Sequence, residues 1–148
     1  MDELVRTLDL RPHPEGGFYK ETYRAPAMLA GTRRSVCTAI YYLLGRGQRS
    51  RLHRIDSDEL WHFYRGDALE IVELTRGGVQ LTRLSPEHPQ HLVPGGTWFG
   101  ARPAAKSEWS LVGCTVSPAF EFDRFELGDR DALLREFPFA RAEIEALT

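Results

Sequence analysis

Residues 47–66 read Gly47-Gln48-Arg49-Ser50-Arg51-Leu52-His53-Arg54-Ile55-Asp56-Ser57-Asp58-Glu59-Leu60-Trp61-His62-Phe63-Tyr64-Arg65-Gly66. Five residues separate Gly47 from His53, five separate His53 from Glu59, and six separate Glu59 from Gly66. The terminal glycines suit turns, since glycine adopts positive φ without a steric cost. At these spacings the segment places an imidazole, His53, and a carboxyl, Glu59, which are side chains of acid–base chemistry.

This spacing resembles the first signature of the cupin superfamily: Gly, five residues, His, one residue, His, three or four residues, Glu, six residues, Gly. Ile55 stands at the second His of that signature. Pro94–Gly96 resembles the Pro-x-Gly turn of the second cupin signature, whose His position holds Phe99. A cupin metal site uses three His and one Glu, and affinity depends on ligand number and geometry. We therefore expect no metal and no other cofactor; the alternative is a weakly held divalent metal at His53 and Glu59.

Four blocks over about residues 5 to 138 resemble a cupin family known only as a domain of unknown function. These blocks are residues 10–19, 39–44, 57–64 and 112–123. The resemblance implies an all-β fold, the cupin double-stranded β-helix or RmlC-like jelly-roll barrel. A length of 148 residues suits one domain, so we expect a single cupin domain over residues 1–148 with short terminal helices.

Charge and hydropathy exclude several classes of partner. The formal net charge is -2 and no basic stripe is present, so nucleic acid is not expected as a partner. No stretch approaches the ~20 apolar residues of a membrane span, and we expect a cytoplasmic protein with Cys37 and Cys114 reduced. Four arginines cluster locally, and they either meet an anionic ligand or form a solvated face: Arg46, Arg49, Arg51 and Arg54.

Short apolar and aromatic runs separated by Gly and Pro indicate strands. The predicted strands are Phe18–Tyr23, Val36–Leu44, Glu59–Arg65, Ala68–Leu74, Val79–Leu84, His91–Val93, Thr97–Ala101, Trp109–Thr115 and Phe122–Glu126. The predicted helices are Asp2–Leu8, Arg130–Glu136 and Arg141–Leu147.

Strand alternation predicts which side chains face the barrel. If Glu59 points inward, Trp61 and Phe63 point inward with it, and together with Phe99 they would bind a substrate ring. Burial among these rings should raise the pKa of Glu59. The opposite face carries the intervening residues, Leu60, His62 and Tyr64.

His53 is the strongest catalytic candidate, because imidazole titrates near neutral pH. Glu59 is the second. In sugar epimerases of the cupin superfamily, which this sequence resembles, a His and a Tyr share the proton transfers. This resemblance makes Tyr41 the third candidate. Tyr41 and Tyr42 point to opposite faces, and spacing alone does not say which one faces the barrel.

Glu15 lies in a segment that Pro12 and Pro14 stiffen and that ends with Gly16-Gly17. Rigid loops often carry function. Glu15 could reach over the barrel mouth and bind substrate, in its own or a partner subunit, or it could be an exposed carboxylate in a turn.

These features favour a metal-independent isomerase or epimerase that acts on a sugar or sugar-like carbonyl compound. The alternatives are a non-catalytic sensor or carrier and a metal-dependent cupin oxygenase or isomerase. We also expect a homodimer through the face of Leu60, His62 and Tyr64. In such a dimer, exchange of Pro12–Gly17 would bring Glu15 to the partner's His53.

Overall fold

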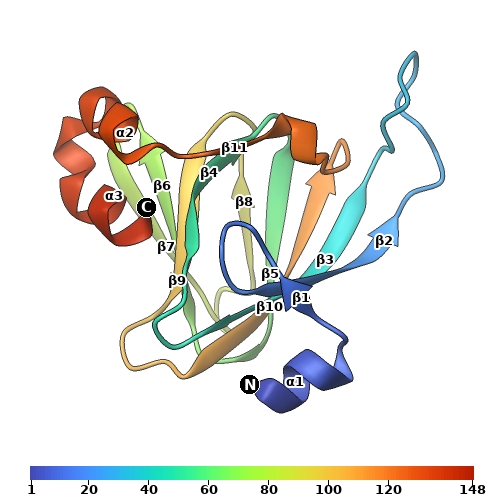
Figure 1. The fold of residues 1–148 in the computed structure, drawn as a ribbon, viewed down its shortest axis with the longest axis horizontal. Coiled ribbons are helices and arrows are strands. Elements are labelled where there is room, and N and C mark those ends of the chain that lie inside the picture. Colours follow the sequence, from blue (N-terminus) through green and yellow to red (C-terminus); the bar gives the residue numbers. More distant parts are fainter.

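The structure is a computed structural model that describes the whole chain, Met1 to Thr148. Two antiparallel sheets enclose a barrel (Figure 1). The first sheet contains, in spatial order, β1 (Arg11–Pro12), β2 (Phe18–Arg24), β3 (Thr38–Gly45), β10 (Trp109–Ser117), β5 (Asp58–Gly66) and β8 (Gln90–Val93). The second contains β11 (Phe125–Leu127), β4 (Ser50–Ile55), β9 (Trp98–Pro103), β6 (Leu69–Thr75) and β7 (Gly78–Leu84). The predicted all-β jelly-roll class is confirmed.

The helices are short and lie at the chain ends, as predicted. They are α1 (Asp2–Thr7), α2 (Arg130–Glu136) and α3 (Arg141–Leu147), with 3-10 turns η1 (Phe122–Arg124) and η2 (Pro138–Ala140). The Asp129 side chain caps α2 by accepting a hydrogen bond from the Ala132 N–H at 2.9 Å, which satisfies a donor that helix geometry leaves free. No helix has the length and apolar character that crossing a membrane requires.

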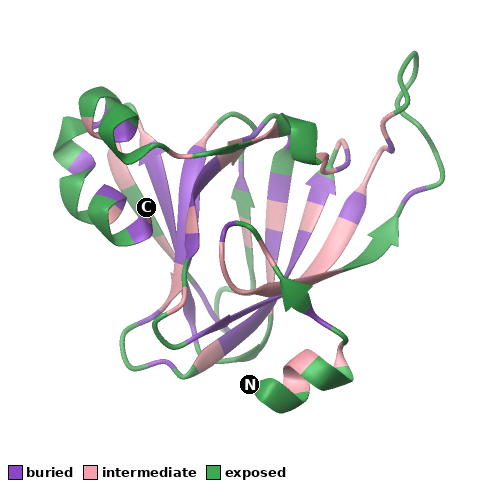
Figure 2. Ribbon diagram, viewed as in Figure 1, coloured by how far each residue is buried: buried purple, intermediate pink, exposed green.

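Alternating side chains divide the apolar residues between two cores. On β6, Leu69 and Ile71 face the barrel interior, while Val72 and Leu74 face the opposite way and pack against α2 and α3. Figure 2 shows this as buried segments around the barrel walls and on the inner sides of the helices. The helices thus cover the outer face of one sheet and leave the barrel interior to the strands.

Strand β5 has the predicted alternation. Trp61 is 1 % exposed and packs in the interior core with Phe63 at its edge, and Glu59 is also buried. On the other face His62 bonds to Thr115 Oγ1 at 3.0 Å, and Tyr64 is exposed. The interior of the barrel therefore receives the Glu59 side chain.

Strand β3 resolves the choice between the two tyrosines. Tyr42 is 1 % exposed and lies in the interior core, whereas Tyr41 lies on the outer face, with its ring 5.9 Å from that of Tyr64. Since both faces of β3 are covered, its sequence is apolar throughout and shows no alternation.

Strand β4 was absent from the predicted strands, although it carries His53. Arg51 and Arg54 are half-buried positions between the buried residues of this strand. Because arginine is charged, the sequence does not show the run of apolar residues that indicates a strand. The predicted strand Phe122–Glu126 is also different, because Phe122–Arg124 forms a 3-10 turn before β11.

Candidate active site

A cavity of about 130 Å³ lies within the barrel and collects residues from both sheets. Its lining consists of His13, Glu15, Tyr19, Glu21, Arg24, Thr38, Ile40, His53, Glu59, Cys114, Val116, Phe120, Glu121 and Phe122. Three of the sequence-predicted residues, Glu15, His53 and Glu59, therefore meet in one place. Acidic and basic side chains that converge in a cavity are the usual mark of a ligand or catalytic site.

His53 is held in a defined tautomer. Its Nδ1 lies 2.7 Å from the Arg51 carbonyl oxygen, which can only accept, so Nδ1 carries a proton and donates. Its Nε2 lies 3.3 Å from Glu15 Oε2. The Phe99 ring packs against the imidazole with centroids 4.2 Å apart. Nε2 is thus the nitrogen that can gain or lose a proton.

Glu15 is buried, with 7 % of its surface exposed, and belongs to the site of its own chain. Its Oε1 accepts a hydrogen bond from Ser50 Oγ at 2.8 Å, while the Tyr42 hydroxyl donates to the Gly16 carbonyl at 2.8 Å. Gly16 has φ +119°, and a side chain there would collide with backbone of the neighbouring loop. The Gly-Gly sequence therefore lets the loop turn inward, and contact between Glu15 and His53 needs no exchange between subunits.

Glu59 is the most perturbed carboxyl of the cavity. It is 7 % exposed, and its pKa is raised from 4.5 to about 7, chiefly because burial disfavours the carboxylate; the nearby His53 acts to lower the pKa and the nearby Glu15 to raise it. The Cys114 thiol also lines the cavity beside it, and burial raises the pKa of that thiol well above its usual value. Glu59 can therefore exist as acid or carboxylate at neutral pH.

His13 is a site residue that the sequence analysis missed. Its Nδ1 accepts a hydrogen bond from the Glu15 N–H at 3.3 Å, and its ring lies 4.6 Å from that of Tyr19 and 6.2 Å from that of Phe122. Because Nδ1 accepts, the ring is neutral with its proton on Nε2, and burial, which lowers the pKa of His13, favours the same form. Its place two residues before Glu15 in the stiff segment was the available signal.

An ion-pair cluster lies at the edge of the cavity. Arg24 donates from Nε and one terminal nitrogen to Glu21 at 3.0 and 2.9 Å, and from the other nitrogen to Glu121 at 3.0 Å. It also donates to the Phe120 carbonyl at 3.2 Å. These bonds tie β2 to the segment that carries Phe120, Glu121 and Phe122.

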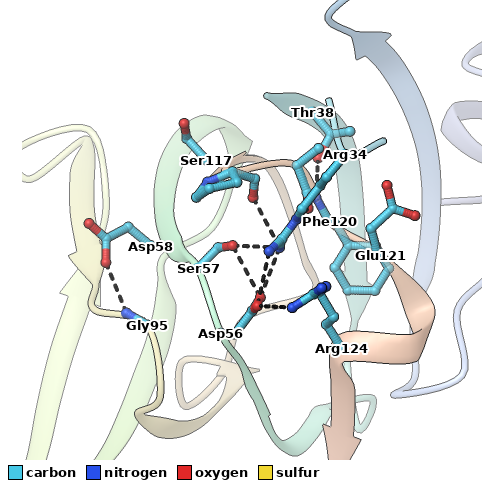
Figure 3. A network of polar contacts seen from close by, with 12 residues as sticks. Arg34, Thr38, Asp56, Ser57, Asp58, Gly95, Ser117, Phe120, Glu121 and Arg124 are labelled. Atoms are coloured by element: carbon cyan, nitrogen blue, oxygen red, sulfur yellow. Dashed lines mark hydrogen bonds and ion pairs between the residues drawn. The ribbon is translucent and has the colours of Figure 1, made fainter. Parts of the chain in front are cut away.

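The same segment is anchored from its other side by Arg34, drawn in Figure 3. Arg34 donates to the Ala119 carbonyl at 2.7 Å, to both oxygens of Asp56 at 2.9 and 2.8 Å, and to Ser57 Oγ at 2.6 Å. Arg124 approaches the same Asp56 carboxylate at 2.9 Å. Hydrogen bonds from Arg34, followed by those from Arg124, hold the pKa of Asp56 at about 2. This network joins the cavity wall to the turn that leads into β5.

The remaining predicted site residues lie elsewhere. Trp61, Phe63 and Phe99 face the barrel interior, as predicted, but pack in its core and do not line the cavity. Tyr41 lies on the outer face of β3, so its assignment as a proton-transfer residue does not agree with its position. Tyr42 is the tyrosine next to the site, through its bond to the Gly16 carbonyl.

The donor set does not fit a cupin metal site. His53 and Glu59 both line the cavity, but the two other positions of the implied ligand set hold the apolar side chains of Ile55 and Phe99, which are 4 % and 1 % exposed. No three His, Cys, Asp or Glu side chains are arranged to hold a metal ion. The cavity therefore offers acid–base side chains and not the ligand set of a cupin metal site.

Comparisons with known proteins identify close structural relatives. The family model described as Cupin superfamily (DUF985) matches residues 2–128. A Shewanella oneidensis protein of known crystal structure is 38% identical, with 99% of this chain and 96% of that chain covered and a TM-score of 0.91. A hypothetical protein from Leishmania major is 30% identical, with 99% and 97% covered and a TM-score of 0.93.

A more distant likeness supports the fold alone. A cupin 2 conserved barrel domain protein from Rhodopseudomonas palustris is 17% identical, with 91% of this chain and 82% of that chain covered and a TM-score of 0.62. No curated protein matches the sequence.

Proposed function

The chain belongs to the family described as Cupin superfamily (DUF985), and we propose that it is a small-molecule enzyme of the isomerase or epimerase kind. It moves protons on a sugar or sugar-like carbonyl compound and uses no metal. The observation that carries this proposal is the meeting of Glu15, His53 and Glu59 in one cavity, with the pKa of Glu59 at about 7. Groups that titrate near the working pH are the most effective proton-transfer catalysts.

The proton transfer uses two of these groups. His53 Nε2 takes the proton from the carbon next to the substrate carbonyl, and the electron pair of the broken C–H bond forms an enol or enolate. Protonated Glu59 then delivers its proton to the same carbon from the opposite side, which gives the epimer. For the isomer, the hydroxyl proton on that carbon first passes to the former carbonyl oxygen, and Glu59 then protonates the former carbonyl carbon. Glu15 lies 3.3 Å from His53 Nε2 and stabilises the imidazolium, and proton exchange with water restores the starting protonation states.

The test is deuterium uptake from solvent. Pentoses and hexoses, as aldoses and ketoses, are incubated with the protein in deuterated water, and NMR follows loss of the proton signal next to the carbonyl. We expect enzyme-dependent exchange, slowed about 100-fold or more in His53→Asn and in Glu59→Gln. Glu143→Gln, at a half-buried position of α3 outside the cavity, is the matched control and should exchange at the wild-type rate. Exchange that both cavity variants leave unchanged would refute the proposal.

A non-catalytic carrier is the second candidate, and the aromatic rings of Tyr19, Phe120 and Phe122 on the cavity lining favour it. Cavities lined largely by apolar rings with a few polar groups are ordinary ligand sites. Mass spectrometry of ligands released from the purified protein separates the two candidates. A compound recovered unchanged after incubation supports the carrier, and a converted compound supports the enzyme.

The cellular location, the partners and the assembly of the protein stay predictions. We propose a cytoplasmic location, a small-molecule ligand in the barrel, no nucleic-acid partner and assembly as a homodimer.

A further inference from the structure

The cavity contains more acidic than basic side chains. Glu15 and Glu59 are buried within it, and Glu21 and Glu121 lie at its edge. The groups available to balance them are Arg24 and His53, because His13 Nδ1 accepts a hydrogen bond from the Glu15 N–H and that ring is therefore neutral. An anionic ligand would therefore enter a site of like charge, which costs free energy in a partly dehydrated cavity.

Arg24 cannot serve as an anion-binding group. It uses four of its five N–H groups on Glu21, Glu121 and the Phe120 carbonyl. Two carboxylates already balance its single charge. An incoming phosphate or carboxylate would have to displace these partners, so the arginine supports the cavity wall and does not attract anions.

Glu59 is a buried carboxyl without a strong hydrogen-bond donor beside it. It is 7 % exposed and lines the cavity, and the side-chain donor beside it is the Cys114 thiol, which is a weak donor. Burying a charged carboxylate without strong donors is costly. A ligand that brings an ammonium group would supply both the missing donors and the opposite charge.

The neighbouring rings suit the same kind of ligand. Tyr19, Phe120 and Phe122 line the cavity, and the rings of Phe120 and Phe122 meet edge to face with centroids 4.9 Å apart. In an edge-to-face pair, the edge of one ring contacts the face of the other. The faces of aromatic rings attract cations. The aromatic and acidic parts of the lining therefore favour the same ligand chemistry.

We propose that this cavity selects an amine-bearing, positively charged ligand and rejects anionic ones such as sugar phosphates and nucleotide sugars. This inference rests on the cavity of the proposed function and specifies its substrate class: an amino sugar or a related amino carbonyl compound. The ammonium group lies against the Glu59 carboxylate and supplies the proton that Glu59 passes to the substrate carbon, with the apolar part of the ligand against the aromatic rings.

Three probes that share one ring test the charge preference. Cyclohexylamine, cyclohexanol and cyclohexanecarboxylate carry a positive, a neutral and a negative group, and their affinities are measured by titration calorimetry at about pH 7. We expect the amine to bind about 10-fold more tightly than the alcohol, and the carboxylate to bind most weakly. Glu59→Gln should remove this preference and the matched control Glu143→Gln should keep it.

A second measurement on the wild-type protein does not depend on any variant. Because a cation beside Glu59 favours the carboxylate, binding of the amine should release a fraction of a proton at about pH 7. Calorimetry in two buffers with different heats of ionisation measures this release. Equal affinity for the three probes, preference for the carboxylate, absence of amine binding at millimolar concentration, or binding without proton release would overturn the inference.

The outcome is separable from that of the proposed function. Amine binding without any deuterium exchange into carbonyl compounds would keep the charge selectivity and remove the catalytic role. Exchange into neutral sugars without preference for the amine would keep catalysis and remove the selectivity.

Discussion

Replacement of Glu59 by glutamine should make the fold more stable in alkaline solution while it removes a reactive group. The folded-state pKa of this carboxyl is about 7, above the ordinary value of 4.5. Below about pH 4.5 the carboxyl is protonated in both the folded and unfolded states, and it carries no charge penalty. As the pH rises from about 4.5 to 7, the unfolded state loses the proton first, so the wild-type protein loses stability.

The size of the effect follows from the two pKa values. At about 1.4 kcal/mol for each pKa unit, a rise from 4.5 to about 7 corresponds to about 3 kcal/mol. Glu59 is only 7 % exposed, so solvent screening reduces this value little. Glutamine has nearly the same shape and cannot ionise, so above about pH 7 the variant should be more stable by about this amount.

Urea unfolding of the wild-type protein, Glu59→Gln and Glu143→Gln at about pH 4.5 and about pH 8.5 provides the measurement. We expect the stability difference between Glu59→Gln and wild type to increase by about 3 kcal/mol between the two conditions, and the control Glu143→Gln to show no such change. A difference that is the same at both pH values would refute the argument, because it would mean that Glu59 carries no buried charge. Stability gained by loss of a reactive group is the usual trade-off at active sites.

Three further predictions concern the cavity wall, metal and assembly. Arg34→Ala should destabilise the fold by about 2 kcal/mol or more in urea unfolding, since it leaves buried acceptors without a donor. The control Arg141→Ala removes only an exposed pair on α3 and should cost less than about 0.5 kcal/mol. Equal losses of stability in the two variants would contradict the anchoring role of Arg34. Treatment with a chelator should leave deuterium exchange unchanged, and near-stoichiometric metal whose removal stops exchange would instead favour the metal-dependent alternative. Light scattering after size exclusion should report about twice the 16.9 kDa chain mass, because the face of Leu60, His62 and Tyr64 is covered in a homodimer; a monomer at micromolar concentration would contradict this assembly.

The fold could be predicted because spacing and alternation are local properties. Glycines at fixed distances from His53 and Glu59 indicated the barrel, and the period of two on β5 placed Glu59 inside it. Strand β4 could not be recognised by the same rule, because arginines occupy positions next to its buried residues. Strand β3 was recognised, but its orientation was not, because both of its faces are covered.

The site was predictable only in part, for a different reason. His53 and Glu59 lie in one continuous motif, and Glu15 drew attention through the prolines and glycines around it. The Cys114 thiol reaches Glu59 because β10 pairs directly with β5, with Cys114 opposite Trp61. Such long-range pairing leaves no mark in a single sequence.

The sheet order also fixes when the site can first exist during synthesis of the chain. Glu15, His53 and Glu59 all lie within residues 1–60, so they leave the ribosome early. However, β3 and β5 do not pair with each other, and β10 (Trp109–Ser117) lies between them. A nascent chain that ends before β10 therefore contains all three ionisable groups but has no framework to bury them. The pKa of Glu59 then stays that of an ordinary hydrated carboxyl, and the chemistry of the cavity begins only when translation is nearly complete.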